Sequence, residues 1–167
     1  MKKIPQYSIL TILVLFGLFY MYTKISAADE GDIAPDFEAT LIDGSDFKLS
    51  NLQGNYVLLD FWGSWCPPCL KESPELVALH KKHAKRLTIV SIALEKNPNT
   101  WKKAVAKYGY TWKNQIVHQN KFVMLSEIAR KYGVSEIPAK FLISPEGRLM
   151  GQYSFEQMNQ VLSNIKE

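Results

Sequence analysis

Two stretches of the chain are mostly apolar and have the length of a β-strand. Residues 56–62 are interrupted only by Asp60, and residues 87–94 form the second stretch. A short apolar run bounded by turn residues is typical of a strand that is covered on both faces of a sheet. The pattern therefore predicts a central sheet with these two strands in its interior.

Helical patterns and turn signals divide the rest of the chain. One helix is expected from Pro67 to about Lys85, with a kink at Pro74, because proline fits a first helical turn and disrupts an interior one. The other expected elements, in chain order, are a hairpin over 37–41 and 47–49, a helix from the Asn97 cap to about Lys107, a short strand over 114–118, a helix over 122–132, a hairpin over 140–144 and 149–153, and a final helix capped by Ser154. Strands that alternate with helices in this way predict an α/β fold with a central mixed β-sheet flanked by helices.

The first 28 residues differ from the rest of the chain. Lys2 and Lys3 precede an apolar stretch from about Ile9 to Tyr22, and small residues follow at 26–28. This order favours a cytoplasmic N-terminus and export of the remaining chain, through an uncleaved membrane anchor or a cleaved signal peptide. Residues 29–167 are then expected to form one exported domain, which begins with a tether over 29–36.

Charge adds little to this picture. The chain has 20 basic and 16 acidic residues, a formal net charge of +4. Three lysines lie in the first 27 residues, which contain no acids, so the remaining 17 basic and 16 acidic residues nearly balance. The basic excess therefore gives no argument for nucleic-acid binding. The pairs Lys81-Lys82 and Lys102-Lys103 are expected on solvated helix faces.

Cys66 and Cys69 are the only cysteines in the chain, and they stand where the first apolar strand ends and its helix begins. A cysteine at a helix N-terminus lies near backbone N–H groups and the positive end of the helix dipole, which favour its thiolate. A second cysteine three residues later lies one turn along the same helix, within bridging distance. The order strand, Cys-x-x-Cys, helix indicates a thiol–disulfide redox site.

Two other uses of the cysteines fit the pattern less well. A purely structural disulfide across two residues would close so small a loop that it constrains the unfolded chain little. A zinc site with His80 and His83 would need converging ligands, whereas His80 lies about 16 Å along the expected helix from Cys69. No metal or other cofactor is therefore expected.

The segment from Val57 to Cys69 (Val-Leu-Leu-Asp-Phe-Trp-Gly-Ser-Trp-Cys-Pro-Pro-Cys) resembles the active-site segment of thioredoxin-fold proteins. Pro74 matches the kink proline of that fold, and Ile137-Pro138 matches the segment that carries its cis-proline. The opening residues 31–37 and a helix–strand insert over about 97–118 resemble the TlpA/ResA branch, which contains membrane-tethered, extracytoplasmic thiol–disulfide oxidoreductases. The resemblance covers almost all of the chain after the leader and implies a thioredoxin fold with an N-terminal β-hairpin and this insert.

The resemblance implies catalytic roles for four residues. Cys66 would be the exposed nucleophile that forms a mixed disulfide with substrate, and Cys69 the buried thiol that resolves it. Asp60 matches the buried acid that accepts the proton of the resolving thiol, and burial should raise its pKa. Glu95 matches an active-site glutamate of ResA-like proteins and would share this proton transfer. For Asp60 the alternative is a strand-end aspartate that reaches solvent or a cap, and for Glu95 it is a solvent-facing glutamate that opens a loop. Ser91 stands where thioredoxins carry the lysine that pairs with the buried acid.

Substrate contacts are expected around the same dithiol. By resemblance, Pro138 forms a cis peptide bond that turns the Ile137 backbone toward the dithiol, where it would offer hydrogen bonds to an extended substrate and thereby assist catalysis. Trp65 is expected to be an exposed cover beside the site, and Pro67 is expected to contact substrate. Trp62 fits a core position as well as a contact position.

Pro67 and Pro68 limit the activation of Cys66. If Cys66 is the N-cap residue, the first two helical N–H donors are missing. The Cys66 thiolate would then depend mainly on the Cys69 N–H and thiol and on the helix dipole. This predicts a moderately lowered Cys66 pKa, and a thiolate of low stability belongs to a reducing couple.

These residues predict an extracytoplasmic thiol–disulfide oxidoreductase, more specifically a protein disulfide reductase, with apocytochrome c as a candidate substrate by resemblance. Expected partners are exported proteins with thiols or disulfides and a membrane thiol reductase as electron donor. Two alternatives stay open: a redox-sensing or thiol-holding adaptor without turnover, and a thiol peroxidase. The peroxidase is disfavoured because Gly63 stands three residues before Cys66, where peroxiredoxins carry threonine.

Overall fold

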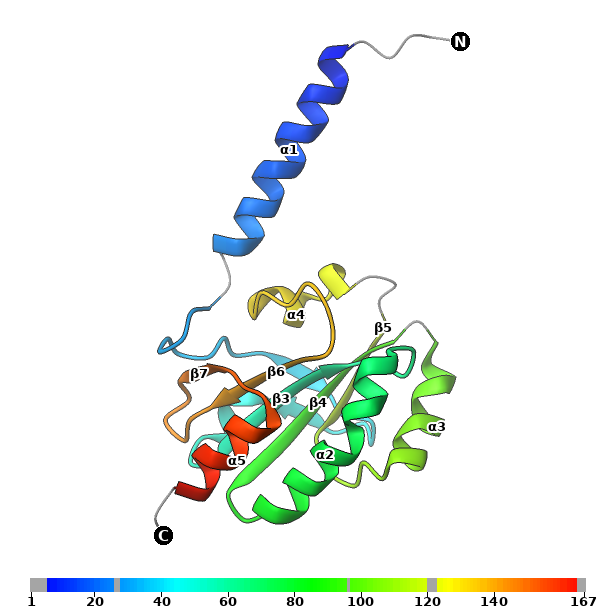
Figure 1. The fold of residues 1–167 in the computed structure, drawn as a ribbon. Coiled ribbons are helices and arrows are strands. Elements are labelled where there is room, and N and C mark those ends of the chain that lie inside the picture. Colours follow the sequence, from blue (N-terminus) through cyan, green and yellow to red (C-terminus); the bar gives the residue numbers. More distant parts are fainter. Residues whose placement is uncertain (1–5, 26–27, 96, 120–122, 165–167) are drawn as a thin grey trace.

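The computed structural model describes residues 6–25, 28–95, 97–119 and 123–164 (Figure 1). Its main sheet has five strands in the order β5-β4-β3-β6-β7, and β1 and β2 form a separate two-stranded sheet. The strands are β1 (Glu38–Thr40), β2 (Asp46–Lys48), β3 (Tyr56–Trp62), β4 (Leu87–Glu95), β5 (Gln115–Gln119), β6 (Ala139–Ile143) and β7 (Leu149–Gln152). The described helices are α1 (Gln6–Ile25), η1 (Leu49–Leu52), α2 (Pro67–His83), α3 (Pro98–Tyr108), η2 (Val123–Leu125), α4 (Glu127–Lys131) and α5 (Phe155–Asn164).

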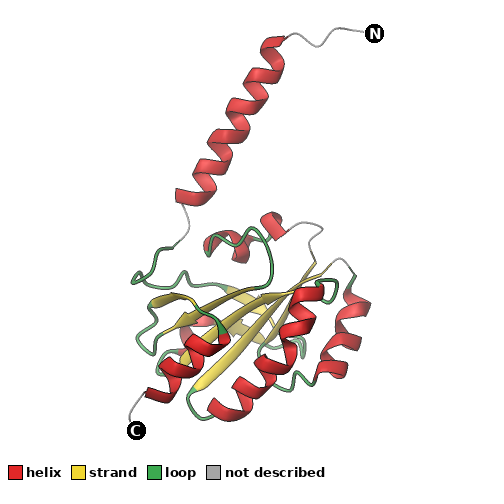
Figure 2. Ribbon diagram, in the orientation of Figure 1, coloured by secondary structure: helices red, strands yellow, loops and turns green. Residues whose placement is uncertain are grey.

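Strand β3 lies in the middle of the sheet, between β4, which runs parallel to it, and β6, which runs antiparallel. Its side chains alternate between two cores, as expected for a strand covered on both faces. Leu59 and Phe61 pack with the β1–β2 hairpin and α4, whereas Leu58 and Trp62 pack with α2, α3 and α5. Figure 2 shows the sheet as a layer with helices packed around it. The predicted α/β class, the two interior strands and the N-terminal hairpin are therefore confirmed.

The helix expected over 122–132 is wrong as a single element. Residues 120–122 lie outside the described residues, and η2 and α4 are separate helices with Ser126 between them. The Ser126 hydroxyl accepts the Ala129 N–H at 3.2 Å and so caps α4. Serine is favoured at a helix N-cap and is less favourable inside a helix. Leu125 of η2 is 61% exposed.

Residues 29–36 do not form a free tether. The Gly31 N–H donates to the Leu149 carbonyl at 2.8 Å, and the Ala34 N–H donates to the Gly147 carbonyl at 2.9 Å. Ala34 is buried in the core. Strand β7 is the edge of the main sheet, and an edge strand leaves backbone groups that a neighbouring segment can pair with. The segment therefore belongs to the folded domain.

Helix α1 extends away from the sheet in Figure 1, and its described apolar side chains, Ile9 and Phe16 among them, are exposed. Among the described residues, none of the helices combines the length and the hydrophobicity needed to cross a membrane.

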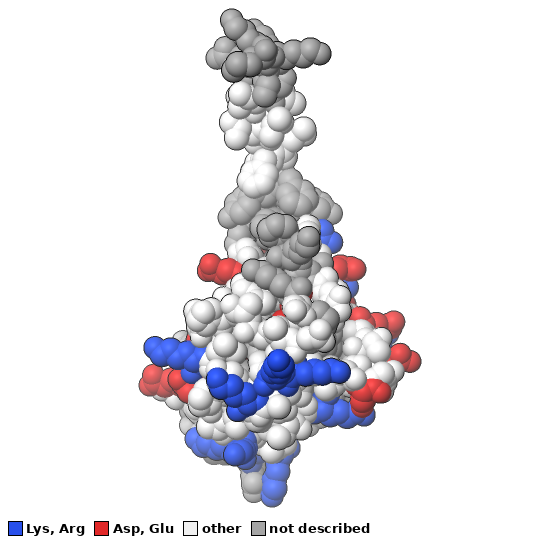
Figure 3. Space-filling view, turned by 90° about the vertical axis from the view of Figure 1, so that its right-hand side faces the viewer, with Lys and Arg blue, Asp and Glu red and all other residues white. Residues whose placement is uncertain are grey.

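The two lysine pairs lie on solvated helix faces, as predicted. Lys81 and Lys82 of α2 and Lys102 and Lys103 of α3 are all exposed. Figure 3 views the side of the molecule that carries α3, and it shows basic side chains at the centre with acidic side chains on both sides. This face has charges of both signs, in agreement with the near balance outside the leader.

Candidate active site

Cys66 and Cys69 form a disulfide at the N-terminus of α2. Cys66 is the N-cap residue, and its Sγ accepts the Cys69 N–H at 3.3 Å. Pro67 and Pro68 are the first two helical residues and have no N–H to donate. The Cys69 N–H is consequently the first helical donor that can reach Cys66, as the two prolines predict.

The expectation of an exposed Cys66 is wrong for this disulfide form. Both cysteines are only 3% exposed. Cys66 Sγ is bonded to Cys69 and lies 3.7 Å from the Ile137 carbonyl oxygen, which leaves little of the sulfur surface to solvent. Trp65, 38% exposed as expected of a cover, and Pro67 reach solvent beside it. These two side chains therefore form the exposed surface beside the buried sulfur.

The segment before β6 brings Ile137 and Pro138 to the dithiol. The Ile137–Pro138 peptide bond is cis in the structure. Both residues are half-buried, and Ile137 packs against both hydrophobic cores. Because the Ile137 carbonyl already faces Cys66 Sγ, a chain bound at the sulfur would lie against this segment.

Asp60 is 2% exposed and lies on the α2 side of the sheet, between Leu58 and Trp62. Ser91 is its partner in the β3–β4 register, and the Ser91 hydroxyl donates to Asp60 Oδ2 at 3.2 Å. Burial raises the pKa of Asp60 to about 6, against the opposing effects of the Lys140 charge and the Ser91 hydrogen bond. Asp60 is therefore buried as predicted and does not reach solvent.

Lys140 is a site residue that the sequence analysis missed. It lies directly opposite Asp60 in the antiparallel β3–β6 register, with Nζ 4.0 Å from Asp60 Oδ1. Its ammonium donates to Glu72 Oε2 of α2, and its side chain is only 9% exposed. Nζ also lies 5.0 Å from the centroid of the Phe155 ring. The available signal was a lysine within an otherwise apolar strand, two residues after Pro138.

Asp60 and Cys69 line one small cavity, which is too narrow to hold a water molecule. Its lining includes Asp60, Cys69, Glu72, Tyr110, Pro138 and Lys140. The Tyr110 hydroxyl shares a 2.9 Å hydrogen bond with Ser73, and burial, reinforced by the Asp60 charge, raises the pKa of Tyr110. At neutral pH the cavity therefore contains two carboxyl groups, one ammonium and a neutral phenol.

Glu95 is 1% exposed at the end of β4, so the solvent-facing alternative is wrong. The Ser64 N–H donates to Glu95 Oε1 at 2.6 Å, and the Ser64 hydroxyl donates to Oε2 at 2.8 Å. Thr100 Oγ1 lies 3.4 Å from Oε2. The hydrogen bonds described for this carboxylate thus fix the loop two residues before Cys66, a positional task that the sequence analysis did not foresee.

Gly63 allows Trp65 to pack beside the site. The Trp65 indole N–H donates to the Leu94 carbonyl at 2.8 Å. A Cβ atom at position 63 would lie 2.9 Å from Trp65 Nε1 and 3.1 Å from the Leu94 oxygen, both too close for a normal contact. Trp62, by contrast, is 1% exposed and belongs to the core.

The two histidines of α2 serve packing and hydrogen bonding. The His80 ring lies edge-on to Trp112 at 5.2 Å between centroids, and His83 Nε2 lies 3.1 Å from Asn159 Oδ1. Within the described part of the chain, no three His, Cys, Asp or Glu residues are grouped so that they could hold a metal ion.

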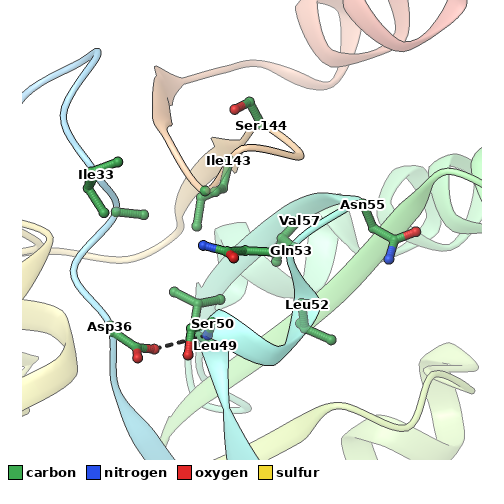
Figure 4. A pocket seen from close by; sticks show the side chains of 12 residues that line it. Ile33, Asp36, Leu49, Ser50, Leu52, Gln53, Asn55, Val57, Ile143 and Ser144 are labelled. Carbon is green, nitrogen blue, oxygen red and sulfur yellow. Dashed lines mark hydrogen bonds between the residues drawn. The ribbon is translucent and has the colours of Figure 1, made fainter.

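A separate cavity lies at the opposite end of β3 (Figure 4). Leu49, Val57 and Ile143 supply part of its apolar lining, and Asp36 Oδ1 accepts the Ser50 N–H at 3.0 Å. Val57 is near the start of β3, whereas the dithiol follows the end of that strand. This cavity is therefore not part of the dithiol site.

Comparisons with known proteins agree with this geometry. The model of the AhpC/TSA family matches residues 31–151. The thiol-disulfide oxidoreductase ResA of Geobacillus thermodenitrificans is 28% identical, over 99% of this chain and 97% of the relative. The ResA protein of Bacillus anthracis is 30% identical, over 93% of this chain and 91% of the relative.

Solved structures are similar over most of the chain. A putative thiol:disulfide interchange protein DsbE from Chlorobium tepidum superposes with a TM-score of 0.71 at 30% identity, over 82% of this chain and 98% of that one. The thioredoxin domain of a thiol-disulfide oxidoreductase from Bacteroides vulgatus gives a TM-score of 0.72 at 26% identity, over 84% of this chain and 100% of that domain. The expected thioredoxin fold is thereby confirmed.

Proposed function

The chain belongs to the AhpC/TSA family and is a thiol–disulfide oxidoreductase of the ResA type; on that premise we propose that it works as a protein disulfide reductase outside the cytoplasm. The observation that carries the reducing direction is the single N–H contact to Cys66 Sγ. Two prolines remove the other early donors of the helix, so the Cys66 thiolate is weakly stabilised. A weakly stabilised thiolate favours the disulfide, and a protein that favours its own disulfide is a reductant.

The reaction needs both sulfurs and one proton acceptor. In the reduced protein, the Cys66 thiolate attacks a substrate disulfide, forms a mixed disulfide and releases one substrate thiolate. The Cys69 thiol then gives its proton to Asp60, and its thiolate attacks Cys66 Sγ. The bond between Cys66 and substrate breaks, the Cys66–Cys69 disulfide forms, and the second substrate thiolate leaves. Two electrons pass to the substrate, and solvent protonates its two thiolates.

The residues around the sulfur would guide the substrate. An extended chain at Cys66 would hydrogen-bond the Ile137 backbone and pack on Pro138, because this segment already faces the sulfur. Trp65 and Pro67 are exposed beside it and would supply apolar contact. These contacts suit protein substrates that present a thiol or a disulfide in an extended segment.

Residues 1–28 would take the domain, residues 29–167, out of the cytoplasm as an anchor or as a cleaved signal peptide. The exposed apolar side chains along α1 support this role, since they suit a lipid or translocon environment. Outside the cytoplasm a dithiol becomes oxidised unless a partner reduces it, so a membrane thiol reductase would regenerate the enzyme. Cytochrome c maturation, with apocytochrome c as substrate, is the proposed setting.

Two other functions have less support from the site. A thiol peroxidase of the peroxiredoxin type would carry threonine at position 63, where even a single Cβ atom would collide with Trp65 and the Leu94 carbonyl. An adaptor that holds thiols without turnover would also use Cys66 and Cys69, and turnover is what separates it from the enzyme.

Turnover and partner capture test the proposal together. The full-length chain in detergent should reduce insulin repeatedly with dithiothreitol, and equilibration with thiol buffers should give a potential near that of thioredoxin, about −270 mV. The Cys69→Ala variant should retain a mixed disulfide with an exported protein, which mass spectrometry identifies. A single stoichiometric response to insulin would favour the adaptor, and a potential near −120 mV, typical of a strong oxidant, would refute the reducing direction.

A further inference from the structure

We propose that Lys140 is a positioning residue of this enzyme, which supplies from β6 the positive charge that keeps Asp60 ionised and ready to take the Cys69 proton, and that Glu72 holds Lys140 in place. The inference rests on the proposed function, because it needs Asp60 to be the acceptor in the resolving step.

The sheet register places Lys140 where it can act on Asp60. Asp60 pairs with Ser91 on β4 and with Lys140 on β6, and side chains directly opposite on neighbouring strands point to the same face. Ser91 gives Asp60 a hydrogen bond but no charge. Lys140 is the basic group in the ion pair described for Asp60, with Nζ 4.0 Å from Oδ1.

Burial makes this charge effective. An ionised carboxylate with 3% of its side chain exposed is strongly disfavoured unless an opposite charge lies close by. Lys140 itself is 9% exposed, with the Phe155 ring 5.0 Å from its ammonium, so solvent screens the pair weakly. Removing Lys140 should therefore change the protonation of Asp60 far more than removing a surface lysine would.

Glu72 has two effects: it holds the Lys140 side chain, and its charge disfavours the ionised form of Asp60. Its carboxylate accepts a hydrogen bond from Lys140 and is 37% exposed, so it connects the buried pair to the surface. As a second negative charge, it disfavours ionisation of Asp60. Substitutions of Lys140 and of Glu72 should therefore act on Asp60 in opposite directions, which removal of a merely structural contact would not produce.

The groups that face Asp60 come from each element packed around it. They are Cys69 and Glu72 on α2, Ser91 on β4, Lys140 on β6 and Tyr110 after α3. Tyr110 stays neutral in the pH range of the reaction, because burial raises its pKa. Among these groups, Lys140 alone favours the ionised carboxylate by its charge.

In the resolving step, the O–H bond forms on Asp60 as the S–H bond of Cys69 breaks. The sulfur electron pair then forms the bond to Cys66 while the bond between Cys66 and substrate breaks, and the substrate thiolate leaves. Lys140 keeps its protons throughout. Its charge increases the fraction of Asp60 that is unprotonated in the mixed disulfide, before Cys69 attacks.

The test separates the two thiol steps. The reduced full-length chain in detergent is mixed with dithiobis(nitrobenzoate), which releases one thionitrobenzoate when Cys66 attacks and a second when Cys69 resolves. Lys140→Met should raise the pH midpoint of the second step by about one unit, which is roughly a tenfold loss of rate below the midpoint. Lys140→Arg should keep the wild-type midpoint. Glu72→Gln should lower it, because the amide oxygen still accepts the Lys140 hydrogen bond whereas the negative charge is gone. The first step should not change.

Lys113→Met is the matched control, since Lys113 is 70% exposed and pairs with Asp43 instead. An unchanged second-step midpoint in Lys140→Met would overturn the inference while leaving the proposed function intact. If Asp60→Asn also keeps the wild-type profile, Asp60 is not the acceptor and the proposed mechanism fails as well. Should Lys140→Met not fold, Lys140→Arg and Glu72→Gln decide: a midpoint that stays at the wild-type value in Glu72→Gln counts against the inference, and so does a midpoint that shifts in Lys140→Arg.

Discussion

Lys140 Nζ lies 4.0 Å from Asp60 Oδ1, across the boundary between the antiparallel strands β6 and β3. The pair places a cation and an acid behind Cys69 in one small cavity. In the proposed reaction, this pair would connect thiol exchange at Cys66 with proton transfer at the buried acid. The acid, the nucleophile and the loop between them can each be tested by substitution.

Asp60→Asn should change how stability depends on pH. Burial raises the pKa of Asp60 from 3.8 to about 6 in the folded protein, so the folded state binds this proton more tightly than the unfolded chain does. The resulting stability is fully present below about pH 4 and is lost as the pH rises through about 6. Relative to wild type, the asparagine variant should gain about 3 kcal/mol between pH 4 and pH 8.

Urea unfolding of both full-length proteins at several pH values, followed by tryptophan fluorescence, measures this difference. Curves of unfolding free energy that stay parallel across this range would mean that Asp60 titrates as it does in the unfolded chain.

Cys66 should be a moderately activated nucleophile. Its Sγ receives one helical N–H, that of Cys69, because Pro67 and Pro68 have none. The rate of iodoacetamide alkylation of the reduced protein should rise with a midpoint near pH 7, as in thioredoxin. Pro68→Ala restores a donor at the second helical position and should lower the midpoint by roughly half a unit to one unit.

Cys69→Ala provides the control that the modified residue is Cys66. A wild-type midpoint below about 5 would contradict this account, since strongly activated Cys-x-x-Cys thiols lie near 3.5.

Glu95→Gln should loosen the loop before the nucleophile. The carboxylate accepts both the N–H and the hydroxyl of Ser64, and hydrogen bonds to a charged group are stronger than those to a neutral amide. Hydrogen exchange of the Ser64 amide should therefore accelerate by about tenfold, corresponding to roughly 1.4 kcal/mol.

Thr100→Val removes a more distant neighbour of Glu95 and should have a smaller effect. If Glu95 takes the Cys69 proton instead, the glutamine variant will slow the second thiol step while Ser64 exchange stays at the wild-type rate.

Gly63→Ala should displace Trp65. The new methyl group would lie 2.9 Å from Trp65 Nε1, so the indole must move and lose its hydrogen bond to Leu94. We expect the free energy of unfolding to fall by about 1–3 kcal/mol, as for other overpacked sites.

A double-mutant cycle with Trp65→Phe, which removes the indole N–H, should recover part of this loss. An additive cycle would show that the strain lies in the Leu94 contact alone.

The sequence alone determined most of the fold, because its signals act locally. Apolar runs produced β3 and β4, and Pro67 began α2 where a first helical turn accepts proline. The Cys-x-x-Cys spacing likewise indicated the redox chemistry without any tertiary information, since both sulfurs lie on one helical turn. The single helix expected over 122–132 was wrong because apolar spacing was given more weight than Ser126, which suits a helix cap better than a helix interior and caps α4.

Tertiary structure decided which charged and polar groups surround the two cysteines and Asp60. No local pattern reveals that Lys140 faces Asp60, because their contact depends on strand order and antiparallel register. The same holds for Glu95, whose hydrogen bonds to Ser64 depend on how the ends of β3 and β4 meet. Residue type and spacing fix which bonds a chain can make locally, whereas the charges that surround a buried group depend on the packing of distant segments.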